Sequence, residues 1–274
     1  MAETLAPEPG QAAARAQFAH EYRLVRRAEG WGSAEATYYR ALPFRDLSGR
    51  FERIWRLRAR SFETFVDGVL RPLEDRLSRR LAVLDLGAGN GWLAYRLAQR
   101  GHTVLAVDLL VDPLDGLGAM RHYDARFAPI QAEFDHLPLG DRTADLAVFN
   151  AALHYSPNYA ATLGEALRVV GRPPGGLLVI LDTPFYRRAA SGARMVQERQ
   201  ARFCRQYGFA SDALGAEGYL TPQRLRRLAV ELGLEWRVLA ARRTWRARVG
   251  RGLSRLRLGR EPAEFPVIVG RRRA

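Results

Sequence analysis

Two acids and three glycines in one segment of the chain have the spacing of a ligand-binding turn. Asp85 is followed by Gly87, Gly89 and Gly91, and Asp108 comes later in the same segment. Glycines let the backbone approach a ligand closely because they carry no Cβ. A carboxylate at the end of the following strand can accept hydrogen bonds from both hydroxyls of a ribose. These five residues therefore predict a site for a ligand that contains a ribose.

The elements around the glycines must hold this turn in place. The apolar run Leu81–Leu86 predicts a buried parallel strand, and a helical pattern begins at Trp92. A second apolar run, Thr103–Val107, predicts the next strand and leads directly into Asp108. The order of strand, glycine turn, helix, strand and acid is typical of nucleotide-binding α/β folds.

The glycine spacing separates three classes of ribose ligand. The 274-residue chain contains no lysine, which excludes a P-loop. Trp92 stands where a nicotinamide or flavin fingerprint has its third glycine, and this disfavours an NAD-dependent oxidoreductase. With an acid two residues before a G-x-G-x-G turn, the sequence resembles the class I S-adenosylmethionine-dependent methyltransferases. Specific motifs carry the resemblance over residues 80–185.

The resemblance implies an α/β fold with a Rossmann-like sheet of seven strands. We expect the sheet to be mostly parallel with an antiparallel last strand, helices on both faces and an N-terminal helical cap. The tail and cap would occupy residues 1–78, and the methyltransferase domain would occupy residues 79–274. Helical patterns over residues 11–28 and 49–77 build the cap, and Pro72 is expected to bend the second helix.

The C-terminal part, residues 186–274, is expected to complete the domain after its core at residues 80–185. A helix is predicted to end before Gly208, and Thr221 is a suitable N-cap for the next helix. Apolar runs over residues 234–240 and 265–269 predict the last two strands.

The resemblance also implies which residues hold S-adenosylmethionine and its product S-adenosylhomocysteine. Asp108 would accept from the ribose hydroxyls, and Leu109 would lie against adenine. Glu133 would accept from the adenine amino group, with Asp135 as its rival. The set expected to bind the cofactor is Asp85, Gly87, Ala88, Gly89, Gly91, Asp108, Leu109, Glu133, Phe134 and Asn150.

The acceptor side of the site offers fewer signals. His154 and Tyr155 follow the strand that is expected to end at Asn150, which in the family lies beside the transferable methyl group. His154 is the candidate general base, because an unperturbed imidazole has a pKa near about 6.5. The alternative is a histidine in the pocket wall or one held in a turn. Tyr38 and Tyr39 are candidates for the substrate pocket, and ordinary packing is the other interpretation. No metal is expected, since the acids and histidines lack ligand spacing.

The charge of the chain is strongly positive and uneven. The 43 basic residues are all arginine, and the net charge is +14. An arginine-rich insertion at residues 242–262 has an amphipathic helical pattern. Such a helix could contact a membrane surface peripherally, pack on the domain or contact nucleic acid. The single cysteine, Cys204, and the lack of a signal region or an apolar run of transmembrane length favour the cytoplasm.

Together these features predict a methyltransferase that acts on a small-molecule or lipid-like acceptor. The signature that methylates exocyclic base amines is missing, because the place after Asn150 reads Ala151-Ala152-Leu153. This disfavours a nucleic-acid acceptor. Two alternatives stay open: an RNA methyltransferase that uses the basic C-terminal region, and a non-catalytic protein that binds S-adenosylmethionine.

Overall fold

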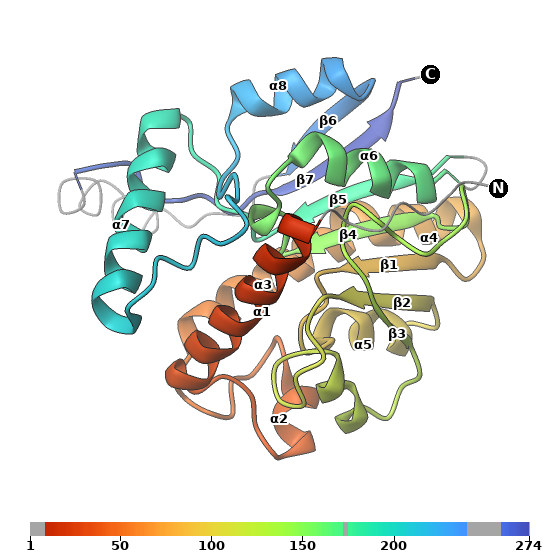
Figure 1. Cartoon of the computed structure of the whole chain (residues 1–274). Helices are drawn as coiled ribbons and strands as arrows, with labels where there is room; N and C mark the ends of the chain where they lie inside the picture. Colours follow the sequence, from red (N-terminus) through yellow and green to blue (C-terminus); the bar gives the residue numbers. More distant parts are fainter. Residues whose placement is uncertain (1–8, 172–174, 240–258, 274) are drawn as a thin grey trace.

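The computed structural model describes residues 9–171, 175–239 and 259–273, and its centre is a seven-stranded sheet (Figure 1). The strands lie in the order β3-β2-β1-β4-β5-β7-β6. They are β1 (Ala82–Leu86), β2 (Thr103–Asp108), β3 (Ala128–Gln131), β4 (Leu146–Asn150), β5 (Leu177–Leu181), β6 (Leu234–Leu239) and β7 (Val267–Arg272). Strands β1 to β5 pair in parallel, and β7 pairs antiparallel with both β5 and β6. The predicted fold class is confirmed.

Alternate residues of the central strands face two separate hydrophobic layers. Val83 and Val148 face the layer formed with α4 (Arg71–Leu77) and α5 (Trp92–Gln99). Leu84 and Phe149 face the opposite layer with α6 (Tyr159–Val169) and α8 (Pro222–Glu231), drawn above the sheet in Figure 1. A parallel sheet that is covered on both faces needs apolar residues at both alternate sets of positions. This explains why its strands read as continuous apolar runs.

The long N-terminal helix predicted over residues 49–77 is interrupted. It consists of α3 (Glu52–Phe65), a π-helical stretch at Val66–Leu70, and α4. Pro72 cannot donate to the carbonyl of Gly68 four residues earlier, and a widened turn relieves the clash. The Gly68 carbonyl instead accepts a hydrogen bond of 2.9 Å from Arg237 Nη2. The irregularity expected at Pro72 therefore lies in the turn before it.

Helix α1 (Pro9–Glu29) crosses the carboxyl ends of the strands (Figure 1). Its C-terminal half is fixed by two ion pairs to the chain after β2. Arg26 pairs with Asp115, and Arg27 Nη2 lies 2.9 Å from Asp112 Oδ2. Helix α2 (Ala36–Ala41) follows. Because Trp55 of α3 shares one core with the sheet, these helices are packed against the strands, and the division at residue 78 stays a prediction.

The C-terminal elements follow the predicted pattern. Helix α7 (Ala189–Tyr207) ends at Gly208, which has a φ of +83°. Thr221 caps α8, since its side chain accepts a 3.0 Å hydrogen bond from the backbone N–H of Arg224. Most of the predicted insertion at residues 242–262, and with it the proposed membrane contact, lies outside the described residues.

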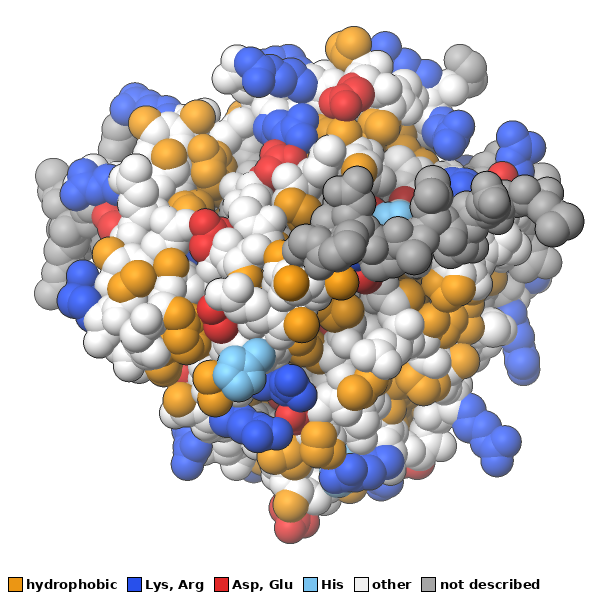
Figure 2. Space-filling model, in the orientation of Figure 1, with side chains coloured by type: hydrophobic (Ala, Val, Ile, Leu, Met, Phe, Trp, Pro, Cys, Tyr) orange, Lys and Arg blue, Asp and Glu red, His pale blue; other side chains and the backbone are white. Residues whose placement is uncertain are grey.

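Within the part of the chain that the structure describes, each helix is too short or too polar to cross a bilayer. On the face shown in Figure 2, the basic side chains of the described residues are spread around the periphery, with hydrophobic and acidic side chains between them. The high net charge is therefore not gathered into one patch on this face.

Candidate active site

A cavity of about 850 Å³, partly open to solvent, lies at the carboxyl ends of β1, β2 and β4 beneath α1. Its wall combines residues from the glycine turn, from the ends of β2 and β4, from the loop after β3 and from α1. These are Arg15, Phe18, Tyr22, Gly87, Gly89, Asp108, Leu109, Leu110, Asp115, Ala132, Glu133, Phe134, Asp135, Ala151, Ala152, Tyr155, Ser156, Pro157, Thr162 and Leu214. Ligand sites of open α/β sheets occur at this edge.

The glycine turn between β1 and α5 forms the floor of the cavity. A Cβ at Gly87 would lie only 2.3 Å from the Cβ of Ala152, so no other residue fits there without movement. A Cβ at Gly89 would meet no protein atom within 4 Å, although Gly89 lines the cavity. The space above Gly89 is therefore open to a ligand that approaches the backbone.

Asp108 supplies the charged group beside this turn. Its Oδ2 accepts from the N–H of Gly89 at 2.7 Å, and its Oδ1 accepts from the N–H of Leu110 at 2.8 Å. Burial raises the pKa of Asp108 to about 6, although these backbone hydrogen bonds oppose the shift. The carboxylate is thereby fixed at the cavity wall with lone pairs left for hydroxyl donors.

Asp85 lies beneath the turn and not at the cavity wall. It is fully buried, and its Oδ2 accepts from the N–H of Ala94 at 3.0 Å, in the first turn of α5. Burial raises the pKa of Asp85 to about 7. The carboxylate joins β1 to α5, and the predicted part of Asp85 in binding the cofactor, by holding the turn and through a water molecule, stays a prediction. Ala88, Gly91 and Asn150 also lie off the cavity wall.

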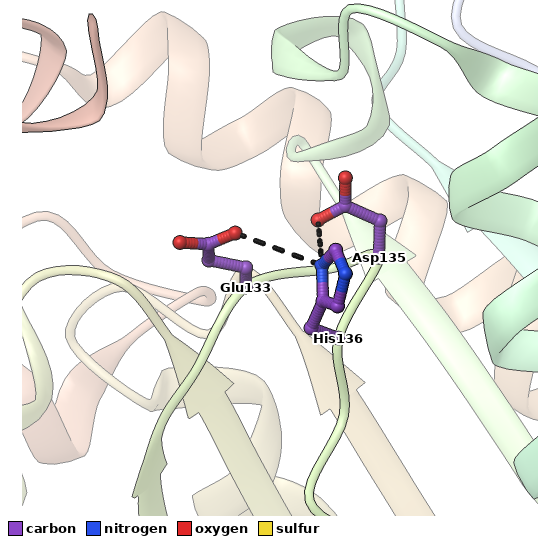
Figure 3. Close-up of side chains that lie close together, drawn as sticks. All are labelled: Glu133, Asp135 and His136. Atoms are coloured by element: carbon purple, nitrogen blue, oxygen red, sulfur yellow. Dashed lines mark ion pairs between the residues drawn. The ribbon is translucent and has the colours of Figure 1, made fainter. Parts of the chain in front are cut away.

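The loop after β3 brings Glu133, Phe134 and Asp135 to the cavity as expected. Glu133, Asp135 and His136 lie close together in Figure 3, and their ligand atoms are within 4.8 Å of one another. Arg15 of α1 pairs with Glu133 and lies 3.8 Å from Asp135. This guanidinium offsets one of the two negative charges and would compete with a metal ion for the acids.

Helix α1 contributes residues that the sequence analysis did not select. Arg15, Phe18 and Tyr22 line the cavity. The ring centroids of Phe18 and Tyr22 each lie 5.7 Å from that of Tyr155. Their spacing of three and four residues places them on one helix face, and this signal could have found them. The predicted helical cap thus covers the cavity through α1.

Residues 84–180 match the family model described as a methyltransferase domain. This chain has a methyltransferase domain. The glycine turn, Asp108 and the loop after β3 all lie within the matched residues, and all three contribute to the cavity wall. The predicted resemblance is confirmed.

Two curated relatives share this domain. Malonyl-(acyl-carrier protein) O-methyltransferase of Buchnera aphidicola subsp. Baizongia pistaciae is 31% identical over 99 residues, which cover 36% of this chain and 38% of that protein. The tRNA 5-carboxymethoxyuridine methyltransferase of Escherichia coli is 29% identical over 117 residues, which cover 40% of this chain and 43% of that protein. The chain spans less than half the length of each of these relatives.

A solved structure matches the whole chain. The structure of the 1,6-didemethyltoxoflavin-N1-methyltransferase of Burkholderia thailandensis contains 1,6-didemethyltoxoflavin and S-adenosylhomocysteine. It is 16% identical, has a TM-score of 0.53, and covers 100% of this chain and 94% of that chain. The likeness shows that the methyltransferase fold extends to the flanking helices.

The prediction that Tyr38 and Tyr39 line the substrate pocket is wrong. Tyr38 is 3% exposed, Tyr39 is fully buried, and neither reaches the cavity of the methyltransferase domain. The Tyr39 hydroxyl lies 2.7 Å from the carbonyl oxygens of Ser33 and Leu114. These tyrosines join α2 to the loop after β2 and belong to the core.

His154 and Tyr155 are neighbours in the sequence but lie in different places relative to the cavity. Tyr155 lines the cavity, whereas His154 does not. Burial, together with the charges of Arg199 and Arg58, lowers the pKa of His154 to about 3. An imidazole with so low a pKa is a poor acceptor of protons at neutral pH, so the assignment of His154 as general base is not supported.

Proposed function

We propose that this chain is an S-adenosylmethionine-dependent methyltransferase that acts on a small molecule. The observation that carries the proposal is the open space above Gly89 beside the fixed carboxylate of Asp108 in one cavity. A backbone cradle without a Cβ and a carboxylate for ribose hydroxyls fit the adenosine part of the cofactor.

Several residues at the cavity wall, and Asp85 beneath the glycine turn, have distinct roles in the proposed binding of the cofactor. Leu109 and Phe134 provide apolar contacts for adenine, and Glu133 accepts from its amino group once Arg15 shares or releases the carboxylate. Asp85 keeps α5 and the turn aligned. Its Oδ1 has no hydrogen-bond partner among the described residues and suits a water-mediated contact with the ammonium group. The bound cofactor supplies an electrophilic methyl group, and the protein aligns it with the acceptor.

The aromatic wall of the cavity favours a small acceptor. Phe18, Tyr22 and Tyr155 form an aromatic wall beside the end of β4, which suits a compact organic molecule. RNA is the second candidate, favoured by the net charge of +14 and by the similarity to the E. coli tRNA methyltransferase. RNA binding would weaken steeply with added salt.

Calorimetry with S-adenosylhomocysteine tests the proposal. Asp108→Ala should weaken binding at least about tenfold, since hydrogen bonds to a charged group contribute roughly 1.5–3 kcal/mol. Asp67→Ala is the matched control, because Asp67 is an exposed carboxylate on the π-helical stretch before α4. Equal affinity of wild type and Asp108→Ala would refute the ribose role, and no binding to the wild type would refute the function.

A further inference from the structure

Buried polar atoms without partners gather at the carboxyl ends of β4 and β5. Asn150 is the last residue of β4, Asp182 directly follows the neighbouring strand β5, and Thr183 comes next. They are 8%, 6% and 2% exposed. Asn150 Oδ1, Asp182 Oδ2 and Thr183 Oγ1 have no hydrogen-bond partner among the described residues, and neither does Nδ1 of His154. Buried polar groups normally have partners, so this concentration indicates a place where a ligand binds.

Two arginines from separate helices approach this group. Arg58 of α3 lies one helical turn before Ser61, whose hydroxyl donates to Asp182 Oδ1 at 2.6 Å. Arg199 belongs to α7, and its charge and that of Arg58 both act on His154. Charged side chains of α3 and α7 therefore both act on this polar group.

Neither arginine has an ion-pair partner at contact distance among the described residues, although the charges of Arg58 and Asp182 stabilise one another. In the described ranges, Arg58 and Arg199 form no ion pair, and the buried Arg199 Nε has no acceptor. The Cζ atom of Arg58 lies 4.7 Å from the ring centroid of Trp55, which orients the guanidinium without neutralising it. Burial raises the pKa of Asp182, so this carboxyl is a weaker counter-charge than an exposed acid. The balance at this place is positive.

The polar group adjoins the cavity. Ala151, Ala152 and Tyr155 line the cavity, and they are interleaved in sequence with Asn150 and His154. The rings of His154 and Tyr155 lie 4.3 Å apart. A small acceptor could thus place its body against the aromatic wall and an anionic group among the buried polar atoms.

We propose that Arg58 and Arg199 bind a carboxylate of the methyl acceptor, which is accordingly an anionic small molecule. The inference rests on the proposed function, because it describes the acceptor half of the same site. Guanidinium groups pair with carboxylates through planar, two-point hydrogen bonds. Asn150, Thr183 and His154 surround this position with polar groups that lack other partners.

Thermal unfolding in the presence of S-adenosylhomocysteine tests the inference. The probes are acetate, hexanoate and benzoate, each compared with its uncharged amide. At least one carboxylate should stabilise the wild type more than its amide does. Arg58→Gln and Arg199→Gln should each raise the half-saturating carboxylate concentration about tenfold. Arg60→Gln and Arg202→Gln are matched controls, because both are exposed arginines on the same two helices.

The outcomes separate this inference from the proposed function. Binding of S-adenosylhomocysteine without any preference for carboxylates would overturn the inference alone. Retained preference in both Arg58→Gln and Arg199→Gln would also overturn it. Inorganic phosphate that stabilises as well as the best carboxylate would overturn the carboxylate assignment and favour an RNA backbone. No binding of S-adenosylhomocysteine to the wild type would overturn both proposals.

Discussion

The site has a β1–β2 half, which lines the cavity, and a β4–β5 half, which is the buried polar group beside the cavity, and the two differ in how they are built. At β1–β2, backbone groups and one carboxylate from a short segment satisfy each other: both oxygens of Asp108 accept backbone hydrogen bonds. At β4–β5, Asn150, Asp182 and Thr183 present buried atoms without partners to side chains from α3 and α7. The Asp108 carboxylate is thus fixed before a ligand binds, whereas Asn150, Asp182 and Thr183 have polar atoms without partners among the described residues.

This difference corresponds to two functions: binding of the cofactor, which is general, and binding of the methyl acceptor, which is specific. A cradle made of backbone can serve any protein that binds the same cofactor, because it depends on a turn more than on particular side chains. The β4–β5 half depends on Arg58 and Arg199, which are far apart in sequence and could change without altering the turn. We therefore expect substitutions in the two halves to separate cofactor binding from acceptor binding.

The largest effect is expected for the substitution Gly89→Ala, which adds a side-chain methyl group to the glycine turn. Gly89→Ala places a Cβ where no protein atom lies within 4 Å, so the change would obstruct the ligand more than the protein. Overpacking of this kind costs roughly 2 kcal/mol, and affinity for S-adenosylhomocysteine should fall about 30-fold in calorimetry. Gly101→Ala is the control, because Gly101 also has a positive φ and open space but lies outside the cavity wall.

Both variants should lose similar stability, since each forces alanine into a left-handed conformation at roughly 1–2 kcal/mol. A similar loss of affinity in both variants would mean that the effect is one of stability. The backbone at Gly89 would then not be in contact with the cofactor, and the proposed difference between the two halves would be wrong.

The same difference explains what could be predicted from the sequence. Gly87, Gly89 and Asp108 were found because a local motif fixes both their spacing and their role. The individual strands were predicted from apolar runs between turns, and the mostly parallel sheet with its antiparallel last strand followed from the resemblance to class I methyltransferases. Tyr38 and Tyr39 were misassigned, since sequence adjacency to a cavity-forming region cannot distinguish a wall residue from a core residue.

The acceptor half could not be found in the same way. Arg58, His154, Asp182 and Arg199 meet only after α3 and α7 pack around the ends of β4 and β5. In a chain with 43 basic residues that are all arginine, composition gives no reason to select two of them. What selects them is their effect on the buried polar atoms and the lack of an ion pair among the described residues, and both depend on tertiary structure.

A second, smaller effect concerns the pH dependence of the β1–β2 half. The pKa of Asp108 is raised to about 6 in the free protein, so its carboxylate gains a proton as the pH falls through that value. Ribose hydroxyls donate to the ionised form, and binding therefore favours loss of that proton. Affinity for S-adenosylhomocysteine should be constant at high pH and fall by up to about tenfold per pH unit below about pH 6.

Calorimetry between pH 5 and pH 8 measures this slope, and Asp108→Asn identifies its source. The steep part below pH 6 should disappear in Asp108→Asn. Asp85, whose pKa is raised to about 7, would still contribute a shallower change near neutral pH. If the slope below pH 6 persisted in Asp108→Asn, the ionisation that controls binding would lie elsewhere in the site.

The smallest expected effect concerns His154, whose imidazole NMR signal should not change with pH. With a pKa lowered to about 3 by burial and by Arg199 and Arg58, His154 should be only about 1% protonated at pH 5. Its imidazole NMR resonance, assigned by its loss in His154→Gln, should therefore stay constant between pH 5 and pH 8. A midpoint between pH 6 and pH 7 would instead restore His154 as a base. The β4–β5 half would then suit an acceptor that must lose a proton, and not a carboxylate that is already ionised.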